Sequence, residues 1–171
     1  IGSFGDGARY ADVQSSPMVQ WRWRQWISAT GSRDRQIWAF AETVSGDLFI
    51  GSDAGVTRWR NDGREQTQID LEPEQMDELR SLLSTSDGQL WASTVGGVYR
   101  IDPETLRTRR FAHAQGLSDL RAYALAEWPR GRLVIGTWSG LYAMPLDGDR
   151  VEALPLRHAG QDHAARLVWD L

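Results

Sequence analysis

The stretch SDGQLWASTVGGVYRID, residues 86–102, contains two turns and two short strands within seventeen residues. Asp87-Gly88 is typical of a two-residue hairpin turn, because glycine adopts a positive φ at little cost. An apolar run follows, then a second turn that contains Gly97, and then another apolar run. Such a hairpin is either a local feature or one copy of a repeat, and a repeat decides the architecture of the whole chain.

The same order of parts occurs three times along the chain. When Gly46, Gly88 and Gly131 are placed in one column, the surrounding residues fall into register at spacings of 42 and 43 residues. The three segments are IWAFAETVSGDLFIGSDAGVTRWR from Ile37, LRSLLSTSDGQLWASTVGGVYRID from Leu79 and AYALAEWPRGRLVIGTWSGLYAMP from Ala122. The chain is therefore built from an internal repeat.

Each copy predicts four short antiparallel strands. An apolar run of about six residues, a glycine turn and a second apolar strand are followed by another glycine turn, a third strand and a more polar fourth strand. Four strands at a period of about 40 to 45 residues are the signature of a β-propeller blade. A blade that is apolar on both faces needs neighbours, so we predict an all-β protein, a β-propeller whose four-stranded antiparallel blades pack on one another.

The repeat divides the chain into about four blades' worth of sequence. We assign a partial blade to residues 1–36, whole blades to 37–78, 79–121 and 122–164, and the first strand of a further blade to 165–171. Either the chain is a fragment of a larger propeller, or its two ends together complete a fourth blade in a closed ring. A fragment exposes unpaired sheet edges. We therefore expect it to associate with the remaining blades of the parent protein or with a second copy.

The composition argues against several classes of protein. The chain has 171 residues and a formal net charge of −4, and its 19 basic residues, all arginine, are spread along the sequence. No nucleic-acid partner is therefore expected. Cysteine is absent, which excludes disulfides and thiolate metal sites. No run of about 18 apolar residues occurs, so a membrane attachment requires a transmembrane helix outside this segment.

Two stretches of the repeat point to a known family. The stretches DGQLWASTVGGVYRID and GRLVIGTWSGLYAM, the second preceded by GLSDLRAYALAE at residues 116–127, resemble the two-component regulator propeller repeat. The resemblance covers nearly the whole chain, with departures such as Phe49 and Val134 where the repeat usually has Trp. It implies a noncatalytic, periplasmic sensor module that passes a signal to a histidine kinase or diguanylate cyclase domain outside this segment. Some relatives sense carbohydrate fragments, and the repeat implies no catalytic residue and no cofactor.

Two sets of positions should lie at one mouth of the propeller. The loop before each first strand and the turn between the second and third strands open on the same face, near the axis. The residues there differ between copies, as expected for a binding surface on a rigid scaffold, although unconstrained loop tips vary in the same way. Aromatic rings and an arginine suit a carbohydrate or another small-molecule ligand. The candidate ligand-binding residues are Trp38, Asp53, Arg80, Tyr123 and Trp138.

Other motifs have a structural interpretation beside a functional one. The alternating stretch VQWRWRQW, residues 19–26, presents tryptophans to sugar rings, or it is an outer strand packed on the next sheet or on a second copy. His158, Asp162 and His163 match no known metal spacing, so we expect no metal site. We expect a structural hydrogen bond from His113 in the linker FAHAQGLS.

Three functions are compatible with this fold, and the fold alone does not choose among them. A sensor module binds a ligand and transmits a change in packing. A propeller-scaffold enzyme, such as a glycosidase or a lyase-like catalyst, needs a histidine or two carboxylates gathered at the axis. A protein-interaction platform uses its broad face without a small ligand. The resemblance favours the sensor module.

Overall fold

The computed structural model describes residues 2–3, 7–10, 24–25, 37–53, 55–60, 65–69, 71 and 79–155. Within these residues the secondary structure is almost entirely β, with one 3-10 helix, η3 (His113–Gln115). In the same part of the chain, no helix is both long and apolar enough to cross a membrane. The all-β class predicted from the repeat is confirmed.

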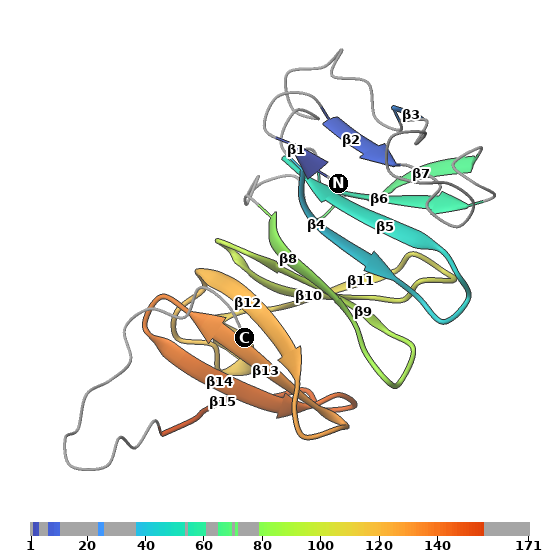
Figure 1. Cartoon of the computed structure of the whole chain (residues 1–171). Helices are drawn as coiled ribbons and strands as arrows, with labels where there is room; N and C mark the ends of the chain where they lie inside the picture. The colour runs from blue at the N-terminus through green and yellow to red at the C-terminus, as the bar shows by residue number, and fades with distance from the viewer. Residues whose placement is uncertain are drawn as a thin grey trace.

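Three sheets of four antiparallel strands follow one another along the chain (Figure 1). Consecutive strands pair within each sheet, so the chain runs up and down as it does in a propeller blade. The first sheet contains β4 (Ile37–Glu42), β5 (Leu48–Ser52), β6 (Gly55–Arg60) and β7 (Glu65–Ile69). The middle sheet contains β8 (Leu79–Ser84), β9 (Leu90–Thr94), β10 (Gly97–Ile101) and β11 (Thr108–Phe111). The third sheet contains β12 (Ala122–Glu127), β13 (Arg132–Thr137), β14 (Gly140–Pro145) and β15 (Glu152–Ala153).

A smaller sheet precedes these three. Strand β1 (Gly2–Ser3) pairs with β2 (Gly7–Tyr10), and β2 pairs with β3 (Arg24–Gln25), both antiparallel. Of the stretch VQWRWRQW, only the two residues of β3 are described, so its tryptophans lie outside the described residues. The blade limits assigned above also stay a prediction, because residues 72–78 and 156–171 are not described.

The hairpin between the first two strands of each four-stranded sheet is a three-residue loop rather than the expected two-residue turn. In the middle sheet, Thr85 N donates to Gln89 O and Gly88 N donates to Thr85 O, each at 2.9 Å. Gly88 has a φ of 81° and occupies the left-handed position that follows a type I turn in such loops. The Thr85 hydroxyl lies 2.6 Å from the Asp87 carboxylate and 3.1 Å from the Gln89 carbonyl. Side-chain hydrogen bonds therefore favour the longer loop.

The middle sheet buries both of its faces. On β9, Leu90 and Ala92 pack with the first sheet, while Trp91 packs with the third sheet. This division follows from strand geometry, because successive side chains point to opposite faces. All five residues of β9 are buried. The sheet therefore separates two apolar cores, as predicted for a blade between two neighbours.

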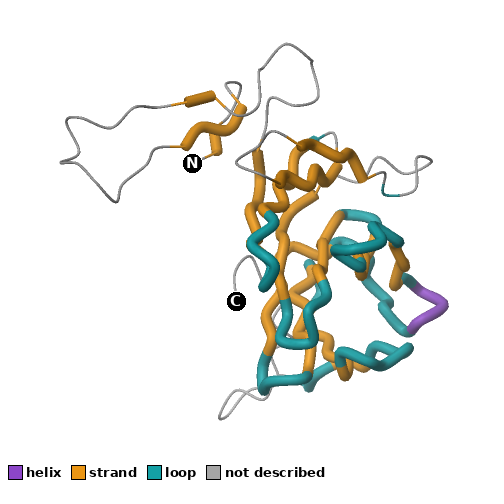
Figure 2. The backbone as a smooth tube through the Cα atoms, turned by 90° about the vertical axis from the view of Figure 1, so that its right-hand side faces the viewer, coloured by secondary structure: helices purple, strands orange, loops and turns teal. Residues whose placement is uncertain are grey.

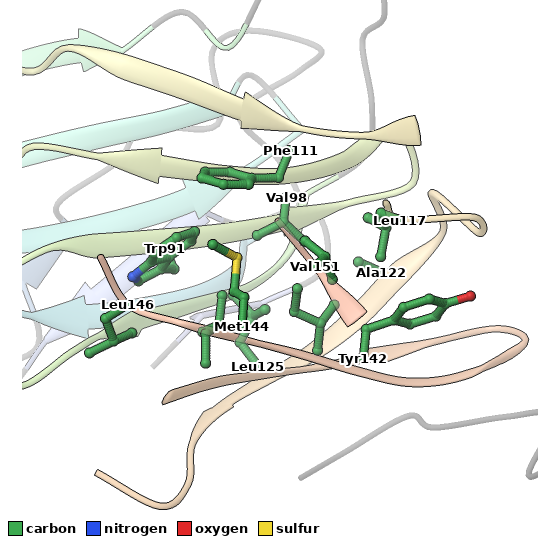
Figure 3. Close-up of a cluster of buried hydrophobic side chains, with 12 residues drawn as sticks. Trp91, Val98, Phe111, Leu117, Ala122, Leu125, Tyr142, Met144, Leu146 and Val151 are labelled. Atoms are coloured by element: carbon green, nitrogen blue, oxygen red, sulfur yellow. The ribbon is translucent and has the colours of Figure 1, made fainter. Parts of the chain in front are cut away.

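The core between the middle and third sheets is shown in Figure 3. The ring centroids of Trp91 and Phe111 lie 5.4 Å apart at an interplanar angle of 47°. Leu125 and Met144 of the third sheet belong to the same cluster. Burial of one such large apolar side chain stabilises the fold by roughly 1.5–3 kcal/mol. This face-to-face packing fixes the position of the sheets relative to one another. Helix η3 lies at the outer edge of the strands, in purple in Figure 2.

Candidate functional site

The first strand of each four-stranded sheet contains a β-bulge at its second residue. Pairing of β4 with β5 passes from Ile37 to Ala39 across a register shift, so Trp38 is the extra residue. The same shift leaves out Arg80 in β8 and Tyr123 in β12. A bulge bends the strand and changes the direction of a side chain. Three of the five predicted site residues therefore occupy one special backbone position, once in each sheet.

These three bulged residues come together because their strands are neighbours. Strands β4, β8 and β12 lie side by side, as Figure 1 shows and as the contacts of β8 with both β4 and β12 confirm. The Cζ atom of Arg80 lies 5.0 Å from the ring centroid of Trp38 and 5.6 Å from that of Tyr123. A guanidinium at such distances is attracted to the negative ring face. Arg80 thus joins the first sheet to the third.

The other two predicted residues lie in the turns beside these strand starts. Trp38 Nε1 donates to Asp53 Oδ1 at 2.6 Å. The rings of Tyr123 and Trp138 have centroids 6.2 Å apart and are tilted by 48°. The structure therefore brings all five predicted residues into one continuous set of contacts, whereas ligand binding by this set stays a proposal.

Two residues that the sequence analysis did not select extend the set. The Cζ atom of Arg121 lies 5.3 Å from the Trp138 ring centroid. Arg121 Nε and Nη2 donate to Asp119 Oδ1 and Oδ2, each at 3.0 Å. Asp119 is 9% exposed, whereas the Arg121 side chain is 51% exposed, so a buried carboxylate holds a guanidinium at the surface. The stretch SDLR, residues 118–121, carries this pair, but in the sequence it is part of the linker before the strand.

We name these seven residues the aromatic–arginine ladder. Its contacts run in order from Asp53 through Trp38, Arg80, Tyr123, Trp138 and Arg121 to Asp119. The ladder crosses all three sheets at the end where their first strands begin. It has a carboxylate at each end, and aromatic rings and guanidinium groups between them.

Two opposing effects act on the pKa of Asp119. Burial raises the pKa, while hydrogen bonds from the side chain and backbone of Arg121 and from the Ser139 side chain lower it. The hydrogen bonds outweigh burial, and the pKa lies below its ordinary value of 3.8. Asp119 is therefore ionised at neutral pH, and the pair with Arg121 is formed there.

His113 has a hydrogen bond of its own away from the ladder. His113 Nδ1 lies 2.9 Å from the Leu117 carbonyl oxygen, in the linker between the middle and third sheets. Among the described residues, no group of three His, Cys, Asp or Glu side chains is placed to hold a metal ion. His158, Asp162 and His163 lie outside the described residues.

Comparison with known proteins gives matches in structure. No family model matches the sequence, and no curated protein is similar to it. The extracellular domain of BT4673 from B. thetaiotaomicron, a candidate one-component system, has 20% identity and a TM-score of 0.63 over 81% of this chain and 18% of that chain. The extracellular domain of BT3049 from B. thetaiotaomicron, a candidate hybrid two-component system, has 17% identity and a TM-score of 0.63 over 83% of this chain and 21% of that chain. Catalytically inactive virginiamycin B lyase from Staphylococcus aureus with quinupristin has 19% identity and a TM-score of 0.57 over 71% and 42% of the two chains.

These matches, together with the stacked four-stranded sheets, decide the architecture. The fold is a β-propeller. The propeller described here spans about a fifth of the length of the two extracellular domains and less than half of the lyase. Extracellular domains of signalling proteins are the class that the repeat resemblance implied, and the TM-scores of 0.63 to them show a shared fold.

Proposed function

We propose that this propeller is a noncatalytic ligand-binding sensor module of a bacterial signalling protein, located in the periplasm. In this proposal it passes a signal to a kinase or cyclase domain outside the chain. The ladder is the observation that carries the proposal, because three bulges direct Trp38, Arg80 and Tyr123 to the same end of neighbouring sheets. The matches to extracellular domains of signalling proteins support the location and the role.

The chemistry of the ladder suits a small ligand with a ring and polar substituents, such as a carbohydrate fragment. Trp138 is 38% exposed at the end of the third sheet, which makes part of its ring accessible. Guanidinium groups supply several hydrogen-bond donors in a fixed plane, and carbohydrate hydroxyls accept such bonds. A ligand that lies along the ladder therefore meets apolar ring surface and polar donors together.

Signal transmission follows from the position of the ladder across three sheets. A ligand that contacts Trp38 and Trp138 together touches the first and the third sheet. It then favours the relative position of the sheets in which both contacts form. We propose that the remaining blades of the parent protein, or a second copy, receive this change through the sheet edges.

A thermal-shift screen of the intact chain against oligosaccharides and small metabolites tests the proposal. A ligand that binds only the native state raises the melting temperature. We expect Trp138→Ala to abolish the shift of any hit. The matched control is Trp128→Ala, because Trp128 is also exposed but lies on the hairpin at the opposite end of the third sheet. A hit that is lost equally in both variants, or a screen without hits, contradicts binding at the ladder.

A lyase-like activity is the second candidate function, because virginiamycin B lyase shares the fold. The intact chain can be incubated with quinupristin, and the antibiotic followed by liquid chromatography. We expect its retention time to stay unchanged. Conversion of quinupristin to a new species would replace the sensor proposal with an enzymatic one.

A further inference from the structure

Arg121 is held in a defined orientation before any ligand binds. Its Nε and Nη2 atoms form a fork to the two oxygens of Asp119, and its guanidinium lies over Trp138. Arg121 N also donates to Asp119 Oδ1 at 3.1 Å, and Trp138 N donates to Arg121 O at 3.0 Å. Because backbone and side chain are both fixed, little conformational entropy remains to be lost when this arginine binds a further group.

The fork leaves one edge of the guanidinium for a ligand. Asp119 occupies the edge formed by Nε and Nη2, and Nη1 has no acceptor among the described residues. The second edge, formed by Nη1 and Nη2, presents two parallel N–H donors in the plane of the group. That spacing matches the two oxygens of a carboxylate, and charge-assisted pairs of this kind are about twice as strong as neutral hydrogen bonds.

The surroundings of this edge restrict what can reach it. The Cζ atom of Arg121 lies 5.3 Å from the Trp138 ring centroid, so an acceptor bound at this edge also lies near the ring. The carboxylates of the ladder stand at its two ends, where Asp53 accepts from Trp38 and Asp119 accepts from Arg121. Arg80 places a second positive charge between Trp38 and Tyr123. In the order of contacts, Arg80 and Arg121 thus both lie between the two carboxylates of the ladder.

We propose that Arg121 is a specificity-determining residue and that the ligand carries a carboxylate, bound by Nη1 and Nη2 beside the Trp138 ring. This inference rests on the proposed function and names the chemical class of its ligand. Asp119 is a positioning residue, because it acts on the ligand through Arg121. The carboxylate belongs either to an acidic sugar or to a small organic acid.

Isothermal titration of the intact chain with matched probes tests the inference. The probes are glucuronate and galacturonate, the corresponding neutral sugars glucose and galactose, and succinate as an acid without a sugar ring. We expect at least tenfold tighter binding of one uronate than of its neutral counterpart. Arg121→Gln should remove this preference, and Arg121→Lys should remove most of it, because lysine keeps the charge but has no fork. Asp119→Asn should weaken uronate binding severalfold.

Controls separate this inference from the proposed function. Arg150→Gln makes the same charge change at an exposed loop position before β15 and should leave the affinity unchanged. Uronates and neutral sugars could bind equally well, with binding lost in Trp138→Ala and kept in Arg121→Gln. This result would overturn the proposal that the ligand carries a carboxylate, but it would leave the sensor proposal standing. Binding of none of the five probes also overturns it. Binding of succinate as tight as that of the uronates identifies an organic acid, whereas uronate binding alone identifies an acidic sugar. Unchanged melting temperature of Arg121→Gln without ligand shows that its fold is intact.

Discussion

The two ends of the stacked sheets are held together by different chemistry. At the end where β4, β8 and β12 begin, the ladder joins the sheets through ring faces and guanidinium groups. At the opposite end, arginines donate to backbone carbonyls of the next sheet. Arg58 Nη1 donates to Pro103 O at 3.0 Å, and Arg100 Nη1 donates to Leu146 O at 3.3 Å.

We call this opposite end, where the first strand of each four-stranded sheet turns into the second, the hairpin end. The arginine links at the hairpin end repeat, whereas the contacts of the ladder do not. Arg58 and Arg100 occupy the same column of the repeat, each three residues after a turn glycine, and the third sheet has Ala143 there. The ladder instead has Trp38, Arg80 and Tyr123 in one column. A repeated bond maintains a repeated spacing between sheets, but a surface for an asymmetric ligand needs different groups at equivalent places. We infer that the hairpin end serves stability and the ladder end serves recognition.

The largest loss of stability is expected from the core that both ends share. Trp91→Ala removes a fully buried ring between the middle and third sheets. The free energy of unfolding should fall by roughly 3–5 kcal/mol, measured by urea denaturation followed by circular dichroism. Trp128→Ala removes a ring that is 73% exposed and should change it by less than about 0.5 kcal/mol. Comparable losses in both variants would show that this core does not support the stack.

A smaller loss is expected at the hairpin end from Glu127→Gln. The Glu127 carboxylate accepts from the Ser86 hydroxyl, from Ser86 N at 2.7 Å and from Gly131 N at 2.6 Å, and so links the middle and third sheets. The variant should lose about 1 kcal/mol in the free energy of unfolding at pH 7, because charged hydrogen bonds become neutral ones.

The same substitution has a pH dependence of known sign. Hydrogen bonds from the Ser86 side chain, and then from the Gly131 backbone, lower the pKa of Glu127 below its ordinary value of 4.5. A carboxyl whose pKa is lower in the folded state stabilises the fold above the unfolded pKa, and this contribution disappears as the pH falls through the folded pKa. We therefore expect the difference in the free energy of unfolding between wild type and Glu127→Gln, measured by urea denaturation, to decrease below about pH 4.5. A difference that does not change with pH would contradict a lowered pKa of Glu127 in the folded protein.

The repeated arginine links should each contribute less. Arg100→Met removes the hydrogen bond to Leu146 O and the charge above the Trp91 ring, 5.9 Å from its centroid, while it keeps an apolar stem. We expect a loss of about 0.5–1 kcal/mol in the free energy of unfolding. Arg58→Met at the equivalent position should give a similar value. A loss confined to one of them would show that the links do not act as a repeated unit.

The smallest effect is expected from the exposed ion pair near the same end. Glu104 is 65% exposed, and its partner Arg60 keeps a contact of 2.6 Å with Asp47 when Glu104 is replaced. Glu104→Gln should leave the melting temperature unchanged at both low and high salt, because exposed ion pairs contribute little and are screened. A clear, salt-dependent decrease would make this pair part of the sheet interface.

The fold was readable from the sequence because its signals are local. Glycine columns at Gly46, Gly88 and Gly131 and short apolar runs between them predicted the three four-stranded sheets. The three-residue hairpin loops were not predicted, because their closure depends on side chains such as Thr85 and Asp87 that also occur in shorter turns. The bulges at the second residue of each first strand carry no distinguishing residue type, since Trp, Arg and Tyr occupy them.

The candidate site was predicted in part for the same reason. The repeat places Trp38, Arg80 and Tyr123 in one column, and this was enough to select them. Their mutual contacts could not be predicted, because residues about 40 positions apart meet only when neighbouring sheets pack. Arg121 and Asp119 were missed because the aligned segments begin at Ile37, Leu79 and Ala122, just after the linker that carries these two residues.

The amino-acid sequence by itself determined a chain of small antiparallel sheets that have to stack, since glycine spacing fixes the turns and apolar strands require cover on both faces. Tertiary structure alone decided which rings stand beside which guanidinium groups, and that the buried Asp119 holds Arg121 by hydrogen bonds. The physical reason is the distance along the chain over which each kind of interaction acts. Turn and strand preferences act over a few neighbouring residues, whereas the ladder depends on bulges and on sheet packing that bring distant residues within about 5 to 6 Å of each other.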